Sequence, residues 1–165
     1  MQYMRLDTAE RESLLAALRS MPAYLRAMFS SLSTAQARAG GPDGAFSPVE
    51  QVWHLADLER EGFGIRIDRL RRGSNPQLPN FDGAAVAAER DYRALSLPEG
   101  LQAFESAREH NLATLRSIDS PEVWAHSGTQ EGVGTVSLCD MPAFMSQHDA
   151  AHRAEIEDWK RRVAS

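Results

Sequence analysis

The stretch from Ser47 to Gly73 constrains the fold more than any other part of the sequence. It opens with serine at the N-cap of a helix, proline at the first helical position and glutamate at the third, and it ends at a glycine, the usual residue just past a helix C-terminus. Apolar residues follow this helix along two stripes. One stripe contains Val49, Val52, Ala56, Phe63, Ile67 and Leu70, and the other contains Leu55, Leu58 and Ile65. A helix that is apolar on two sides must be buried on both, either inside a bundle or between a bundle and a partner subunit.

The rest of the chain supplies further helices and no pattern typical of strands. Periodicity predicts helices over residues 7–32 with an interruption at Pro22, 47–72, 84–95, 98–118 and 137–162, and loops over 35–46, 73–83 and 119–136. No segment alternates apolar and polar residues as a half-buried strand does. We therefore expect an all-α fold, a bundle of four main helices in which not every connection is a tight hairpin. The length of 165 residues predicts a single domain over residues 1–165.

Two histidines lie inside the apolar face of the last predicted helix. His148 and His152 are four residues apart, so their side chains point the same way on successive turns. Their neighbours on that face are Leu138, Met141, Phe144, Met145, Ile156 and Trp159. An unsatisfied polar group in such a position costs about 1–3 kcal/mol, so both imidazoles need partners. A divalent metal would serve both, and hydrogen bonds to carboxylates or backbone carbonyls are the alternative.

A third histidine, His54, lies on the second stripe of the helix over 47–72, which can face the last helix across the interior of a small bundle. Three imidazoles from two helices make an open metal site, with positions left for water or substrate. Imidazole suits several divalent metals, of which we expect zinc or nickel. A metal-bound histidine usually donates its other N–H to a carboxylate or carbonyl. Asp57 and Glu61 are the expected acceptors, and Asp149 and Glu155 are also within a turn or two.

Three other residues have side chains capable of chemistry. Arg108 lies on the core-facing stripe of the helix over 98–118, where it can bind a substrate carboxylate or form an internal salt bridge with Asp57 or Glu61. His126, in a glycine-rich loop, either lines a pocket or lies at the surface. Cys139, the single cysteine, excludes an internal disulfide, and a small buried residue is a more usual role for it than a nucleophile.

Charge and hydropathy exclude some classes of partner. The net charge of −5 argues against nucleic acid, whose backbone requires a basic surface. Four arginines, Arg66, Arg69, Arg71 and Arg72, lie near the end of the helix over 47–72, and we interpret them as a solvated helix terminus, with phosphate binding as the alternative. No apolar run of membrane-spanning length and no signal-peptide pattern are present, which predicts a cytoplasmic protein without membrane contact.

Several short stretches spread over residues 10–160 together indicate a protein family more specifically than any one of them does. They are Met21-Pro22-Ala23-Tyr24-Leu25, Phe46-Ser47-Pro48-Val49-Glu50-Gln51-Val52-Trp53-His54-Leu55-Ala56-Asp57-Leu58-Glu59, Phe104-x3-Arg108-x3-Leu112-x2-Leu115, Trp124-Ala125-His126-Ser127-Gly128, Gly134-Thr135-Val136-Ser137-Leu138 and His148-Asp149-x2-His152. In this order and spacing, the sequence resembles the DinB-like family of metal-binding bundles, also called DinB/YfiT-like. The resemblance implies a four-helix bundle with a long crossover connection and a three-histidine divalent metal site. By position, its ligands are His54, His148 and His152, and family relatives are often homodimers.

The family resemblance also suggests an activity. It implies a divalent-metal-dependent enzyme acting on a small molecule, either an S-transferase that uses a low-molecular-weight thiol or a related isomerase. Two alternatives remain open: a metal-dependent hydrolase of a small ester, amide or lactone, and a non-catalytic metal-binding bundle with a stress or binding role. An open site with three histidines favours catalysis, whereas a fourth protein ligand, Glu61 or Glu155, favours a structural ion.

Overall fold

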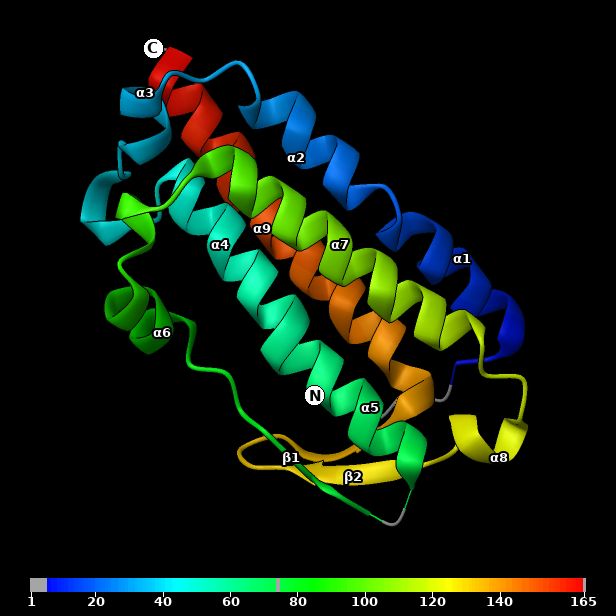
Figure 1. The fold of residues 1–165 in the computed structure, drawn as a ribbon. Helices are drawn as coiled ribbons and strands as arrows, with labels where there is room; N and C mark the ends of the chain where they lie inside the picture. The colour runs from blue at the N-terminus through cyan, green and yellow to red at the C-terminus, as the bar shows by residue number, and fades with distance from the viewer. Residues whose placement is uncertain (1–5, 74, 165) are drawn as a thin grey trace.

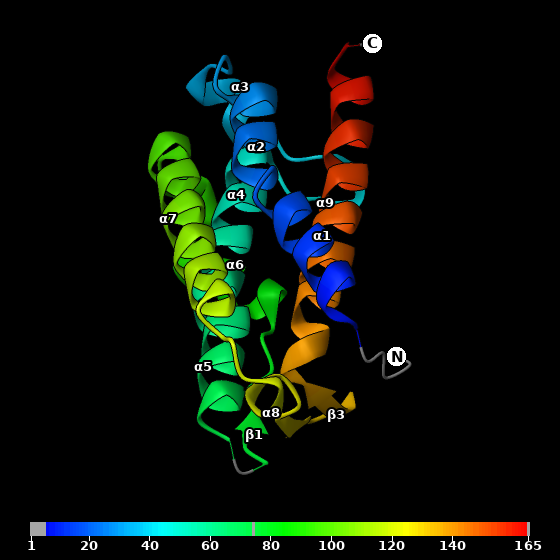
Figure 2. The same cartoon turned by 90° about the vertical axis from the view of Figure 1, so that its right-hand side faces the viewer.

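The computed structural model describes residues 6–73 and 75–164, and their fold is a four-helix bundle (Figures 1 and 2). Its four helical segments are α1 (Thr8–Leu18) with α2 (Met21–Phe29), α4 (Pro48–Asp57) with the π-helical turn η2 (Leu58–Phe63) and α5 (Gly64–Arg72), α7 (Leu97–Arg116), and α9 (Met141–Ala164). The all-α class and the long connections are therefore confirmed. No helix among the described residues is both long and apolar enough to cross a bilayer.

Three connections between the four helical segments carry the smaller elements. The first link, before α4, contains α3 (Thr34–Arg38) and η1 (Pro42–Gly44); the second contains β1 (Gln77–Leu78), α6 (Gly83–Arg90) and η3 (Tyr92–Ala94); the third contains α8 (Pro121–Trp124), β2 (Ser127–Gln130), β3 (Gly134–Ser137) and η4 (Leu138–Asp140). The strands form a small sheet in the order β1-β2-β3, with β1 parallel to β2 and β2 antiparallel to β3. This sheet contradicts the expectation of loops there, and it lies with α8 at one end of the bundle (Figure 1).

Local sequence signals explain where the helices begin and end. The side chain of Asp7 accepts from the backbone of Glu10 at the start of α1, and Ser47 and Glu50 form the same reciprocal capping box at the start of α4. Gly73 ends α5 with φ +87°, a conformation that a side chain would strain. The helix expected over 47–72 is thus confirmed at both ends, but the π turn at its centre was not anticipated.

The apolar core is divided into two clusters by a layer of polar side chains. One cluster contains Leu112 and Leu115 of α7 with Met141 and Met145 of α9, and the other contains Leu97, Leu101 and Phe104 of α7 with Ile156 of α9. Between the clusters, α7 contributes Arg108 and Asn111, and α9 contributes His148, Asp149 and His152. We call these five residues, together with His54 and Glu59, the polar layer.

Most of the second stripe of the helix over 47–72 is buried within the chain itself. Leu55 and Leu58 are 2% and 6% exposed, whereas Ile65 is 37% exposed. Burial inside the bundle therefore accounts for the two apolar sides. The homodimer implied by the family resemblance stays a prediction.

Candidate metal centre

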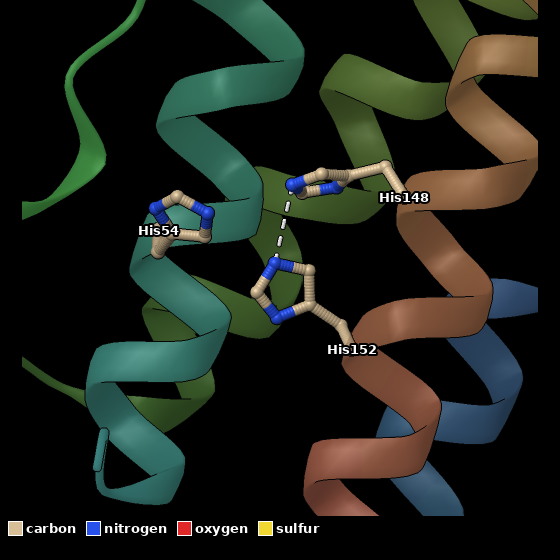
Figure 3. A group of neighbouring side chains, drawn as sticks. All are labelled: His54, His148 and His152. Atoms are coloured by element: carbon tan, nitrogen blue, oxygen red, sulfur yellow. Dashed lines mark hydrogen bonds between the residues drawn. The ribbon is translucent and has the colours of Figure 1, made fainter. Parts of the chain in front are cut away.

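Three imidazoles meet in the polar layer, from the two helices that the sequence indicated. His54 projects from α4, and His148 and His152 project from successive turns of α9 (Figure 3). One ring nitrogen of each residue lies within 4.8 Å of those of the other two. The ring centroids of His148 and His152 are 4.4 Å apart, and those of His54 and His152 are 5.0 Å apart. The structure thus brings together all three residues predicted as ligands.

Hydrogen bonds on its outer side fix the orientation of the His152 ring. Its Nδ1 lies 2.6 Å from Oε1 of Gln51 and 3.1 Å from a carboxylate oxygen of Glu155. Gln51 in turn donates from Nε2 to Glu155 over 2.8 Å, which directs its amide oxygen at the ring. Since both neighbours of Nδ1 are acceptors, Nδ1 carries the proton and the lone pair of Nε2 faces His148.

The spacing of the two histidines on α9 and the protonation states of all three rings fit a divalent cation. Two imidazole nitrogens at about 2.0–2.1 Å from one tetrahedral zinc are about 3.3 Å apart, and the Nε2 atoms of His148 and His152 are 3.2 Å apart. Burial and the neighbouring imidazoles lower the pKa of His54 to about 4 and that of His148 to about 3. Burial also lowers the pKa of His152, against the opposing effect of Glu155. The rings are therefore neutral at pH 7, the form that coordinates a metal.

The outer edge of His54 packs against a glycine of the long crossover. Nδ1 of His54 is buried and makes no hydrogen bond to any described residue. In Figure 3 the other ring nitrogen faces the pair on α9. A Cβ atom at Gly83, the first residue of α6, would lie 2.4 Å from Cε1 and 2.6 Å from Nδ1 of His54. The absence of a side chain at residue 83 therefore allows the ring to occupy its position.

Replacement of Gly83 by alanine is expected to weaken metal binding about ten- to hundredfold, the range for losing the support of a ligand. Alanine usually stabilises a helix relative to glycine by about 0.5–1 kcal/mol, so an ordinary helix effect would have the opposite sign. Competition with a chromophoric chelator measures the affinity. Ala84→Ser, at the exposed neighbouring position, is the control, and equal affinities in all three proteins would contradict the role of this contact.

Aromatic rings surround the three imidazoles. Phe46 and Phe81 lie 5.6 and 6.0 Å from His54, and Phe63 contacts His148 edge-on at 5.8 Å, measured between ring centroids.

Two clefts open beside this centre. One of about 350 Å³ is lined by His152 and Glu155, and the other of about 320 Å³ is lined by His148. Each ligand of α9 therefore lines a cleft of a size that admits a small molecule.

The predicted outer partners Asp57 and Glu61 do not bond to the histidines. Asp57 accepts hydrogen bonds from Arg60, from Arg90 at 2.6 Å and from the hydroxyl of Tyr92 at 2.6 Å. Burial opposes ionisation, but these bonds keep the pKa of Asp57 below its ordinary value. Glu61 forms a two-point ion pair with Arg90. Glu155, which the sequence also offered as an acceptor, and Gln51, which it did not, lie against His152 instead, because the crossover supplies competing donors to Asp57 and Glu61.

Arg108 makes an internal ion cluster, which leaves none of its donors for a substrate. Its guanidinium pairs with both oxygens of Glu59, at 2.9 and 3.1 Å, and both of Asp149, at 2.8 and 2.9 Å. A fifth bond goes to the backbone oxygen of Leu18. Despite the opposing effect of burial, the two carboxylates raise the pKa of Arg108. The prediction of a substrate-binding role is therefore not supported, and the expected salt-bridge partners Asp57 and Glu61 were wrong.

The π turn explains why the sequence did not reveal Glu59 as the partner of Arg108. The backbone oxygen of Glu59 accepts from N–H of Gly64, five residues on, and from Nδ2 of Asn111. Asn111 also donates to the Glu59 carboxylate over 3.1 Å. Regular helical spacing does not describe this turn, and π turns are frequent at functional sites.

Two other sequence candidates lie outside the metal centre. His126 is half-buried, and its Nδ1 lies 2.9 Å from the backbone oxygen of Leu70 in the last turn of α5. Cys139 is buried, with its sulfur 3.1 Å from Oγ of Ser137, and burial raises the pKa of its thiol. Cys139 is thus a buried residue with a weakened tendency to ionise, as expected for a structural role.

Comparisons with known proteins agree with this architecture. Residues 17–156 match the model of the DinB superfamily. A protein of Geobacillus thermodenitrificans, provisionally named a metal-dependent hydrolase, is 24% identical over 90% of this chain and 83% of its own length. A protein of Geobacillus kaustophilus with the same provisional name is 22% identical over 96% of this chain and 88% of its own.

Two solved structures share the fold. YfiT from Bacillus subtilis, described as a probable metal-dependent hydrolase with an unusual four-helix bundle topology, superposes with a TM-score of 0.89 at 18% identity, over 99% of this chain and 93% of YfiT. The mycothiol-dependent maleylpyruvate isomerase superposes with a TM-score of 0.70 at 14% identity, over 88% of this chain and 60% of the isomerase. Because the family model matches most of its length and the fold agrees with that match, the chain belongs to the DinB superfamily.

Proposed function

We propose that the protein is a metal-dependent enzyme in which His54, His148 and His152 hold a divalent ion, zinc or nickel. The observation that carries the proposal is the openness of the donor set. Glu61 is paired with Arg90, and Glu155 lies behind the ring of His152, against Nδ1. Neither carboxylate joins the group of ligand nitrogens, and three protein ligands are typical of a catalytic ion.

The chain's own residues prepare the site for an acid–base reaction. A divalent ion held by three neutral imidazoles supplies Lewis acidity, which lowers the pKa of a small nucleophile such as a thiol or water. Gln51 and Glu155 keep the lone pair of His152 directed inward. The Glu155 side chain is 56% exposed and lines the cleft beside His152, so it can accept a proton from a nucleophile that enters there.

The two clefts support a reaction between two small molecules. One cleft is lined by His152 and the other by His148, so a nucleophile and an electrophile can each lie beside one ligand of the centre. We therefore favour an S-transferase that uses a low-molecular-weight thiol, or a related thiol-dependent isomerase. The fold shared with an isomerase described as mycothiol-dependent supports the choice of a thiol. Hydrolysis of a small ester, amide or lactone is the second candidate, supported by the provisional names of the relatives.

A metal and activity assay tests the proposal. Elemental analysis of the purified protein is expected to give about one divalent ion per chain. The protein is then incubated with several thiols and either a chlorodinitrobenzene or an epoxide, and in parallel with nitrophenyl esters and a lactone. Mass spectrometry should find the thioether product, and a chelator should abolish its formation until metal is restored. Ester or lactone cleavage without thioether would select the hydrolase, and identical rates with and without metal would overturn both.

Chelation is also expected to lower the thermal midpoint only moderately. The two apolar clusters are formed by the helices themselves and need no metal. Differential scanning calorimetry of the metal-free and reloaded protein measures the difference. Complete unfolding on chelation would indicate a structural ion and support the non-catalytic alternative.

A further inference from the structure

The cleft beside His148 combines apolar walls with a single arginine. It has a volume of about 320 Å³ and is lined by Phe63, Val136, Met141 and Phe144, together with Arg66 of α5. Among its described lining residues, Arg66 is the one that carries a full charge at pH 7. A pocket of this kind, mostly apolar with few polar groups, is typical of a site for a small ligand, and its volume is near the lower end of the usual range of about 300–1,000 Å³.

Arg66 is buried without a carboxylate partner. Arg66 is 8% exposed, and its Nε donates to the backbone oxygen of Pro79 over 2.9 Å. Within the described part of the chain, no ion pair reaches its guanidinium. Arg71 and Arg72 are exposed and pair with Asp68, so the expectation of a solvated helix end holds for them and is wrong for Arg66.

The contrast with Arg108 shows what Arg66 lacks. Both arginines are buried, but two carboxylates raise the pKa of Arg108, whereas burial alone lowers the pKa of Arg66. An unpaired charge in the protein interior is unfavourable, as is the charge left behind when a buried ion pair is broken. The free edge of the guanidinium is suited to a planar anion, which it can bind through two parallel hydrogen bonds.

We propose that this cleft binds the electrophilic substrate and that the substrate is a small organic acid, with its carboxylate on Arg66 and its hydrocarbon part on the apolar wall. Phe63 contacts both ends of this arrangement, since its ring lies 5.6 Å from the Arg66 guanidinium and 5.8 Å from the His148 ring. A carboxylate on Arg66 would thus leave the rest of a short molecule beside His148. The role of substrate rests on the proposed function, whereas binding of the acid needs no metal.

The apolar wall distinguishes an organic acid from inorganic phosphate. Phosphate would use the guanidinium but would gain nothing from Val136, Met141 and Phe144. A carboxylic acid with a hydrocarbon body uses both. We therefore expect the neutral amide of the same acid to bind weakly and phosphate to compete poorly.

Binding of 3-phenylpropionate to the full chain tests this inference, with 3-phenylpropionamide as the neutral probe. Calorimetry on chelated and metal-loaded protein should show the acid binding about ten- to hundredfold more tightly than the amide, the range for a hydrogen bond to a charged group. Arg66→Met should remove that difference, and Arg66→Lys should keep part of it. Arg72→Gln, which changes an exposed arginine of the same helix, should bind like the wild type.

Stability provides a second readout, because Arg66→Met removes an unpaired buried charge. The variant should unfold at the same or a higher temperature than the wild type, whereas loss of a structural ion pair would lower it. Equal binding of acid and amide, unchanged binding in Arg66→Met, or full displacement by equimolar inorganic phosphate would overturn the assignment. Selective acid binding in a protein that shows no metal-dependent turnover would overturn the proposed function and leave the acid site in place.

Discussion

Replacement of His148 by alanine is expected to abolish stoichiometric metal binding. His148 supplies one of the three neutral nitrogens, and its Nε2 lies 3.2 Å from that of His152. The two remaining imidazoles are insufficient for the usual three or four protein ligands of a zinc site. Elemental analysis and competition with a chelator measure the loss. His110→Ala, which changes an exposed histidine of α7, should retain the metal, and undiminished metal in His148→Ala would show that the site lies elsewhere.

The metal-free forms of the same proteins give a second readout through pH. The pKa of His148 is lowered from 6.5 to about 3, so the unfolded chain binds the proton more readily than the folded chain. Stability contributed by the neutral ring is therefore present above pH 6.5 and is lost as the pH falls toward 3. The metal-free wild type should lose stability over this range, and His148→Ala should lose less. Parallel pH profiles of the two proteins would contradict the burial of a neutral ring.

Arg108→Met is expected to lower the free energy of unfolding by about 3–5 kcal/mol, the cost of leaving buried charges without their partner. Arg108 and Glu59 have side chains 1% and 2% exposed, and Asp149 is 9% exposed, so water can compensate little. Methionine keeps much of the apolar volume and removes only the charge and its five hydrogen bonds. Unfolding in urea, followed by circular dichroism, measures the change.

Two further variants separate charge from packing in this cluster. Arg72→Met removes an exposed arginine and should change stability by less than about 0.5 kcal/mol. The triple variant Glu59→Gln, Asp149→Asn, Arg108→Met should recover part of the loss, because no buried charge then remains unpaired. A loss below about 1 kcal/mol in Arg108→Met alone would mean that the carboxylates are hydrated or otherwise compensated.

The sequence predicted the three histidines because their positions follow local rules. His148 and His152 share a face through the four-residue spacing, and the capped helix that carries His54 begins at an unambiguous Ser47-Pro48 signal. Helix ends were predictable for the same reason, since Gly73 and the capping residues act within one turn. The fold class followed from this periodicity, and the family resemblance supplied the topology.

The supporting contacts of the histidines could not be predicted from local rules. Gln51 contacts His152 and Gly83 contacts His54, in each case from an element that is distant in sequence. Neither glutamine nor glycine is a residue type that signals such a role. Arg66 and Arg72 both belong to the arginine-rich end of the same helix, yet Arg66 is buried with its Nε on the backbone oxygen of Pro79, whereas Arg72 is exposed. The strands were missed because they are only two to four residues long, and the two longer ones are rich in glycine, serine and threonine and show no clear alternation.

The polar layer also determines how the helices line up lengthwise. A slide of α9 by one turn, about 5.4 Å, would carry Asp149 away from Arg108 and leave its carboxylate among the apolar side chains of an adjacent cluster. Leucine and methionine faces alone tolerate such slides, because one hydrocarbon contact replaces another. Because the buried charges of the polar layer lose their partners when a helix slides, each shifted alignment is unfavourable. The salt bridges of Arg108 with Glu59 and Asp149 therefore also fix how His54 lines up with the two histidines of α9.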